Sequence, residues 1–215
     1  MITIALSVAA AVSGALAIAA DWEERRHRAF FVLKPLTTLL IILVAASLSV
    51  DGPYAQAVLV ALALSLCGDV FLMFGDGARA SDRAFIAGLV SFLLAHIAFV
   101  FAFAQDLRAP ALPGWLAAVV FYALALLFVL LPRAGRLKLP VLVYCLVLAA
   151  MVFAAAARHA SLHDADTLRA VLGALLFLAS DSLLAVRRFV GRYRGAQALI
   201  LSSYWSAIGL IAWSV

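Results

Sequence analysis

The amino-acid sequence predicts an all-α membrane protein, a polytopic bundle of eight transmembrane helices in one domain that spans residues 1–215. The first observation is composition, because 67% of the residues are hydrophobic and 13% are charged. A soluble domain is closer to half apolar and a quarter charged, so this composition indicates a membrane protein. The second observation is spacing, because the apolar residues fall into runs close to the ~20 residues that cross a bilayer.

Prolines and charged residues separate the eight apolar runs and set the expected helix ends. The first run lacks the positively charged start of a signal peptide, so we expect a spanning helix there. Of the six prolines, Pro35 falls in the first turns of a run, and the others lie in or beside turns, where a missing N–H is harmless. The expected helices are Ile2–Ala20, Ala29–Val50, Ala55–Phe74, Ala84–Ala104, Pro113–Leu131, Leu139–Ala157, Leu168–Val186 and Gly195–Trp213.

Other features argue against several classes of site. Cys67 and Cys145 both lie within apolar runs, so they indicate small buried residues and no disulfide framework. The net charge of +5 does not indicate nucleic-acid binding, because the basic residues lie in short loops and form no stripe. His159 and His163 have the i, i+4 spacing of metal ligands, but their loop lies far from the buried charges. We expect no metal, no cofactor and no protein partner.

Loop charge predicts the orientation in the cell membrane. One set of loops holds twelve basic residues and the other set holds three, and cytoplasmic loops carry an excess of Lys and Arg. Both termini are therefore expected on the non-cytoplasmic side. The twelve are Arg25, Arg26, Arg28, Arg79, Arg83, Arg133, Arg136, Lys138, Arg187, Arg188, Arg192 and Arg194, and the three are Arg108, Arg158 and Arg169.

Four ionisable side chains lie within the expected spans, where a charge costs about 2.5–3.5 kcal/mol at the bilayer centre and marks a site by default. At 1.5 Å per residue, Asp69, Asp181 and Lys34 lie roughly 7–9 Å inside the cytoplasmic end of their helices. His96 lies deeper, at roughly 18 Å. Three of these groups share one level, and a bundle could bring them together.

Two short matches indicate an internal 4+4 parallel repeat. The start of the second helix, Leu33-Lys34-Pro35-Leu36, resembles the start of the sixth, Leu137-Lys138-Leu139-Pro140. Gly68-Asp69 near the end of the third helix resembles Ser180-Asp181 near the end of the seventh. Four helices per half keep both copies in the same orientation, so the two aspartates would be pseudo-equivalent and could face each other.

Four fragments, taken together and in this order, resemble the YhhN family of multi-pass membrane proteins, whose characterised members are lysoplasmalogenases. The family often has Tyr three residues after the histidine of the third fragment, where this chain has Phe99, which lacks a hydroxyl. The fragments are Lys34-Pro35-Leu36, Ser65-x-x-Gly68-Asp69, Phe85-x-x-Gly88-x-x-x-Phe92-x-x-x-His96 and Gly173-Ala174-x-Leu176-Phe177-x-x-Ser180-Asp181.

The resemblance implies hydrolysis of the vinyl ether bond of a lysoplasmalogen to a fatty aldehyde and a glycerophospho-headgroup. The lysophospholipid substrate would enter from the bilayer lipids, with its tail among the helices and its phosphate near Lys34. Vinyl ethers open by protonation of the outer alkene carbon, and glycosidases handle a similar cation with paired carboxyl groups. The expected catalytic pair is Asp69 and Asp181, and the expected substrate-binding residues are Lys34, His96, Ser65, Ser180, Phe177 and Tyr204.

Several alternatives stay open at this point. A transporter could use the same buried charges for proton coupling, and an accessory membrane protein could use the aspartates for contacts between helices, for instance with Ser65. Lys34 could bind phosphate, pair with an aspartate or snorkel to the membrane surface. His96 could line a cavity or make a plain interhelical hydrogen bond, and Tyr204 could be pocket wall or packing.

Overall fold

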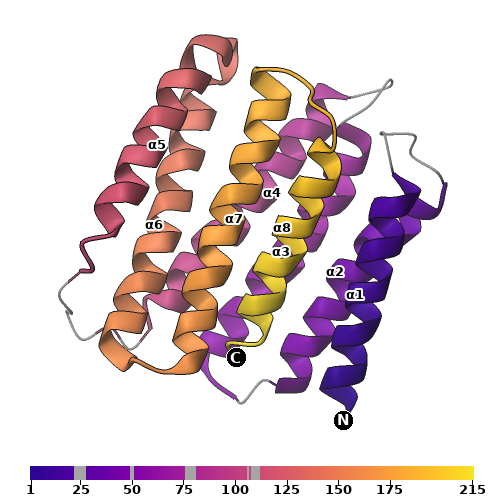
Figure 1. Ribbon diagram of the computed structural model, residues 1–215, viewed down its shortest axis with the longest axis vertical. Helices are drawn as coiled ribbons and strands as arrows, with labels where there is room; N and C mark the ends of the chain where they lie inside the picture. The colour runs from indigo at the N-terminus through magenta and orange to yellow at the C-terminus, as the bar shows by residue number, and fades with distance from the viewer. Residues whose placement is uncertain (22–27, 49–50, 76–80, 106, 108–111) are drawn as a thin grey trace.

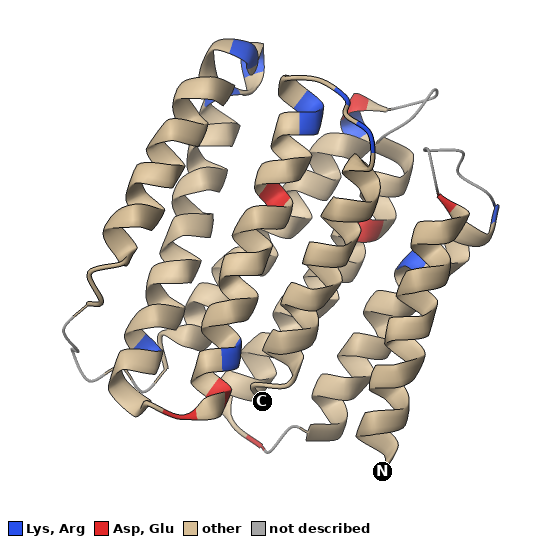
Figure 2. Ribbon diagram, in the orientation of Figure 1, with Lys and Arg blue, Asp and Glu red and all other residues tan. Residues whose placement is uncertain are grey.

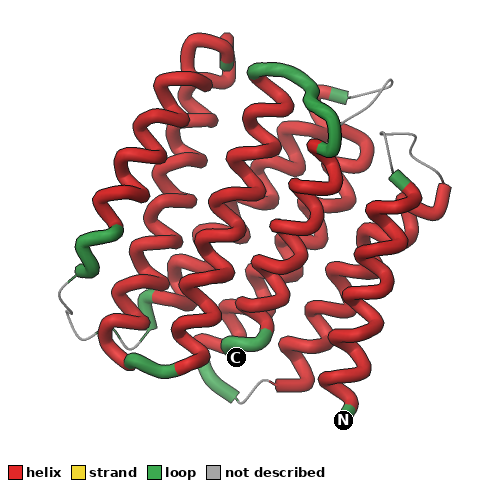
Figure 3. The backbone as a smooth tube through the Cα atoms, in the orientation of Figure 1, coloured by secondary structure: helices red, strands yellow, loops and turns green. Residues whose placement is uncertain are grey.

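The protein is a bundle of α-helices, and the described residues contain no strand (Figures 1 and 3). The computed structural model describes residues 1–21, 28–48, 51–75, 81–105, 107 and 112–215. Two short 3₁₀ turns, η2 (Leu131–Arg133) and η3 (Gly135–Leu137), connect the fifth helix to the sixth. The helices are α1 (Ile2–Ala20), α2 (Arg28–Leu48), α3 (Pro53–Gly75), α4 (Asp82–Phe103), α5 (Leu116–Leu130), α6 (Lys138–Leu162), α7 (Ala165–Phe189) and α8 (Ala196–Ala212).

The eight predicted helices are confirmed, and most ends agree within about three residues. The larger difference is at the junction of α6 and α7, where α6 continues five residues beyond the predicted Ala157. Hydropathy marks only the part of a helix that is apolar, and these turns are polar. α7 begins directly after Asp164, whose side chain caps the helix by accepting a hydrogen bond from the Thr167 backbone N–H at 2.7 Å. This hydrogen bond holds the pKa of the Asp164 carboxyl below its ordinary value.

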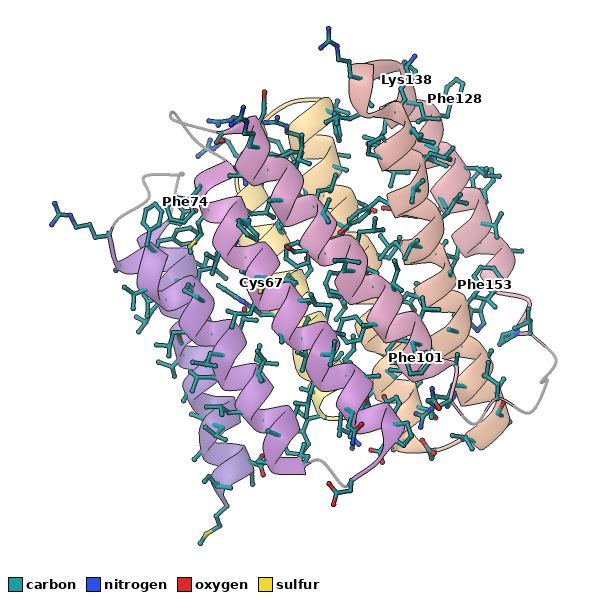
Figure 4. All side chains as sticks on the ribbon, turned by 180° about the vertical axis from the view of Figure 1, so that it is seen from behind. Cys67, Phe74, Phe101, Phe128, Lys138 and Phe153 are labelled. Atoms are coloured by element: carbon teal, nitrogen blue, oxygen red, sulfur yellow. The ribbon has the colours of Figure 1, made fainter. Side chains whose placement is uncertain are left out.

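The outer surface of the bundle is apolar. Phe128 is 82% exposed and Phe121 is 75% exposed, and Figure 4 shows Phe128 at the outer edge of the molecule. A soluble protein rarely leaves so much contiguous apolar surface in water. Within the described ranges, seven helical segments are long and apolar enough to cross a membrane, and α8 is a shorter apolar helix. The seven are α1 to α4, α5 together with η2, η3 together with α6, and α7. The chain is therefore a multi-pass membrane protein.

The helices form two outer pairs and a central group (Figure 1). The pair α1 and α2 lies on one side, the pair α5 and α6 lies on the other, and α3, α4, α7 and α8 lie between them. In the first half α2 packs against α3 and α8, and in the second half α6 packs against α7 and α4. A 4+4 repeat would exchange α2 with α6 and α8 with α4, so this packing supports the repeat, which stays a prediction.

Charge is concentrated at the two ends of the bundle (Figure 2). Both termini lie at one end. Arg158 lies near the end of α6 and over the Tyr54 ring, and Arg169 lies in the first turns of α7. The described basic residues of the predicted twelve lie at the opposite end, which we call the basic end. Arg25, Arg26 and Arg79 of the twelve, and Arg108 of the three, lie outside the described residues.

Glycine allows close approach of α7 and α8. A Cβ atom on Gly173 would lie 2.8 Å from the Ala207 carbonyl oxygen and 2.6 Å from Cγ1 of Ile211, closer than real contacts allow. Membrane helices often use small residues in this way, because close packing replaces the missing hydrophobic effect. Gly209 on α8 has open space around it, since outside the adjacent part of its own helix no atom lies within 4 Å of its hypothetical Cβ.

Gly173→Ala is therefore expected to destabilise the protein, while Gly209→Ala makes the same chemical change without a clash. Overpacking costs about 1–3 kcal/mol, whereas Gly to Ala in an open helix position is neutral or stabilising by up to about 1 kcal/mol. Thermal unfolding in detergent should give Gly173→Ala a melting temperature at least about 2–4 °C below that of Gly209→Ala. Equal melting temperatures would contradict this packing.

Candidate active site

Both predicted aspartates line one cavity near the basic end of the bundle. This central cavity has a volume of about 320 Å³ and is formed by residues of α2, α3, α4, α7, α8 and the turn after α7. Its wall is unusually polar for the interior of a membrane protein. The polar and charged side chains that line it are Lys34, Asp69, Ser180, Asp181, Arg187, Arg188, Arg192, Gln197 and Tyr204.

Asp69 is the more fully bonded of the two carboxylates. It is 1% exposed, and its Oδ1 lies 3.3 Å from Nζ of Lys34 on α2. Its Oδ2 accepts hydrogen bonds from Thr38 Oγ1 on the same helix at 2.6 Å and from the Tyr204 hydroxyl on α8 at 2.8 Å. The Trp205 indole N–H donates to Thr38 Oγ1 at 3.2 Å and fixes that hydroxyl. A buried carboxylate needs such partners to offset the loss of water.

Asp181 has a different set of partners. The Tyr144 hydroxyl of α6 donates to its Oδ2 at 2.5 Å, and Nε2 of His96 on α4 lies 3.6 Å from the same oxygen. The His96 ring is fully buried between Phe177 and Tyr144, with ring-centroid distances of 4.6 and 5.3 Å. Neither ring nitrogen of His96 has a hydrogen-bond partner among the described residues.

An aromatic layer lies beneath the two carboxylates. The Tyr204 ring makes edge contacts with Phe92 at 5.7 Å and with Phe177 at 5.5 Å between centroids. Gly68 makes room for this layer, because a Cβ there would lie 2.6 Å from the Phe92 ring. The Gly68-Asp69 pair thus lets α4 approach α3 just beside the carboxylate. No hydrogen bond or ion pair within the described part of the chain joins Asp69 to Asp181 directly.

The structure places the remaining predicted residues in three ways. Ser180 lines the central cavity, and its hydroxyl donates to the Ile200 carbonyl at 3.0 Å. His96 and Phe177 lie behind the cavity wall and contact the residues that form it. Ser65 lies one turn from Asp69, but its hydroxyl donates to the Ala61 carbonyl at 2.9 Å.

Three kinds of site residue were not predicted from the sequence. Thr38 could have been predicted, because it lies four residues after Lys34 and therefore on the same face of the helix. Tyr144 could not, since one tyrosine in an apolar helix also suits plain packing. For Arg187 and Arg188 the sequence leaves two interpretations open, interfacial anchors or groups that attract an anionic headgroup, and neither predicts a place in the cavity wall. There, Arg187 donates to Gln197, and Arg188 donates to Asp82 at 3.0 Å and lies over the Phe85 ring at 4.2 Å.

His159 and His163 do not converge on a shared site. Nδ1 of His159 lies 2.9 Å from Thr167 Oγ1, and the two imidazole centroids are 6.0 Å apart. A search of the described ranges gives no group of three or more His, Cys, Asp or Glu side chains placed to hold a metal ion.

Comparisons with known proteins relate most of the chain to one family. The sequence model of the YhhN family matches residues 29–215. The chain is 31% identical to the pig protein named lysoplasmalogenase TMEM86B over 185 residues, which cover 86% of this chain and 74% of that protein. It is 38% identical over 129 residues to a Mycobacterium bovis protein named lysoplasmalogenase, covering 57% of this chain and 46% of that protein.

A third relative gives a similar result. The human protein named lysoplasmalogenase TMEM86B is 32% identical over 168 residues, which cover 78% of this chain and 66% of that protein. The chain therefore spans less than two thirds of the length of some of these relatives. No solved structure matches the chain.

The Lys34–Asp69 pair yields a stability prediction. Lys34→Met leaves a buried carboxylate without its cation, which costs roughly 3–5 kcal/mol, whereas adding Asp69→Asn removes the orphaned charge. We therefore expect the double variant to melt at a higher temperature than Lys34→Met alone in detergent.

The control is Lys138→Met, which changes an exposed lysine at the matching position of the sixth helix and should leave the melting temperature unchanged. Additive losses in the Lys34→Met/Asp69→Asn protein would show that the two side chains do not depend on each other.

Proposed function

The chain belongs to the YhhN family, and from this premise we propose that it hydrolyses the vinyl ether bond of lysoplasmalogens. The products are a fatty aldehyde and a glycerophospho-headgroup. The observation that carries the proposal is the central cavity, which has a basic rim and is lined by two carboxylates with different partners. The Asp69 side chain is 2% exposed and the Asp181 side chain is 10% exposed. The names of the similar pig, human and mycobacterial proteins support the same reaction.

The reaction needs one proton donor and one anion. Protonation of the outer alkene carbon converts the vinyl ether into an oxocarbenium ion at the carbon that carries the ether oxygen. Water then adds to that carbon and gives a proton back to the carboxylate that supplied one. The resulting hemiacetal loses its hydroxyl proton and forms the aldehyde as its bond to the glycerol oxygen breaks, and that oxygen takes up a proton. Glycosidases pass through a similar cation with one carboxylic acid and one carboxylate.

We assign the acid role to Asp181 and the anion role to Asp69. The Lys34 ammonium and two hydroxyl donors stabilise Asp69 as a carboxylate, which would steady the cation and orient water. The hydrogen bond to Asp181 comes from the neutral Tyr144 hydroxyl, which leaves Oδ1 to carry and deliver a proton. His96 would position Asp181 and Tyr144 from behind the cavity wall.

The headgroup would lie at the basic rim of the cavity. Lys34 is engaged with Asp69 through both a carboxylate and a backbone oxygen, which favours a partner role over a phosphate contact. Arg188 and Arg192 line the cavity at the end of α7 and in the turn that follows it. Guanidinium groups suit phosphate recognition, so this rim is our proposed headgroup site.

The catalytic test uses Asp69→Asn and Asp181→Asn in purified protein. Each should lower kcat roughly 100- to 10,000-fold, because a positioned acid or base contributes a factor of that size. The double variant should be little worse than either single one, since residues that act as a unit are not additive. Proton transfer to carbon should also give a sizeable solvent deuterium isotope effect on the wild-type rate.

Asp51→Asn is the matched control, because it removes an exposed carboxylate outside the cavity and should keep wild-type turnover. A folded Asp181→Asn protein with near-wild-type turnover would remove Asp181 from the acid role. A wild-type protein that binds lysoplasmalogen and returns it intact would favour a transporter over a hydrolase.

The charge at the basic end supports an orientation in the cell membrane. We propose that this end faces the cytoplasm and that both termini face away from it, because cytoplasmic loops are rich in Lys and Arg. A C-terminal fusion in a bacterial host should give activity with a periplasmic reporter and none with a cytoplasmic one. Activity from the cytoplasmic reporter alone would overturn both the orientation and the cytoplasmic position of the site.

A further inference from the structure

A second, narrow cavity lies beside the central one, and we call it the lateral groove. It is bounded by α4, α5, α6 and α7 and has a volume of about 60 Å³. Its walls are almost entirely apolar, in contrast to the charged wall of the central cavity. The side chains of Leu89, Leu130, Val141, Cys145 and Leu178 are representative of its lining.

The two cavities meet at one point. Phe85, Asp181, Leu184 and Arg188 line both of them. Tyr144, whose hydroxyl donates to Asp181, also lines the lateral groove. Asp181 therefore lies where the wall changes from charged and polar to apolar.

A vinyl ether lipid has the same change of polarity at its reactive bond. The glycerol oxygen and the headgroup lie on one side of the bond, and the hydrocarbon chain begins on the other. A ligand of this kind minimises unfavourable burial when its polar part lies in the central cavity and its chain lies against apolar walls. That placement brings the bond itself beside Asp181.

We propose that the lateral groove binds the first carbons of the alkenyl chain and so presents the double bond to Asp181. This inference rests on the proposed function and assigns specificity to residues of α5 and α6 that line no part of the central cavity. The groove is much smaller than the central cavity, about 60 Å³ against about 320 Å³, so it holds only the start of the chain. The rest of the chain would then lie outside the groove, among the bilayer lipids.

The test fills the groove and compares two substrates with the same headgroup. One substrate has a long alkenyl chain, and the other is a 1-propenyl ether that reaches little beyond the double bond. Cys145→Phe places a ring in the groove and should lower the ratio of kcat/KM for the long chain to kcat/KM for the propenyl ether roughly tenfold, the value of losing two buried methylene contacts.

The control is the neighbouring substitution Leu146→Phe, because Leu146 is 59% exposed and does not line the groove. It should keep the wild-type ratio. Should Cys145→Phe fail to fold, Ala185→Leu fills the groove from α7, where Ala185 is only partly buried.

The outcomes separate the two proposals. A wild-type ratio in a folded groove-filled variant would overturn the chain site and leave the proposed hydrolysis intact. A wild-type protein that cleaves neither substrate would overturn the hydrolysis and, with it, the inference that rests on it. An equal fall of the ratio in Leu146→Phe would show that the effect does not come from the groove.

Discussion

The burial of the Asp69 carboxylate is the constraint on which the rest of the bundle depends. An ionised group inside a membrane protein is tolerated only when other groups replace its water. For Asp69 these groups come from two helices, Lys34 and Thr38 on α2 and Tyr204 on α8. The carboxylate on α3 therefore fixes the position of α2 and α8 around the central cavity, and the three helices form a site only when they are packed together.

In the second half of the bundle, the partners of the carboxylate are other residues. Asp181 on α7 meets Tyr144 from α6 and His96 from α4, the helices that a 4+4 repeat would match with α2 and α8. In the predicted repeat α2 would correspond to α6, but α2 supplies Lys34 and Thr38 to its aspartate whereas α6 supplies Tyr144. Because the partners differ, the two carboxylates differ in bonding, and a pair with unlike environments is what an acid and an anion require.

The sequence predicted the helices well and the site only in part. Apolar runs give the membrane-spanning helices, whereas the polar turns at the junction of α6 and α7 leave no such signal. Lys34, Asp69 and Asp181 share one depth, so a bundle could bring them together, and all three line the central cavity. The sequence left open whether His96 lines a cavity, because depth carries no information on rotation about a helix axis, and the structure places His96 behind the cavity wall. Tyr144 gave no signal at all, because its role depends on which helix packs against α6.

The arrangement of the two cavities bears on how a membrane enzyme supplies water to a lipid. Hydrolysis needs water at a bond that is attached to a hydrocarbon chain. The water comes from the aqueous phase, whereas the lipid comes from the bilayer. The central cavity reaches the basic end, where Arg192 lies in the turn after α7, and the lateral groove runs among apolar side chains of α4 to α7. A carboxyl group at their junction can receive water from one side and the chain from the other. Its position, as much as its acidity, would then restrict the reaction to lipids whose polarity changes at the bond to be broken.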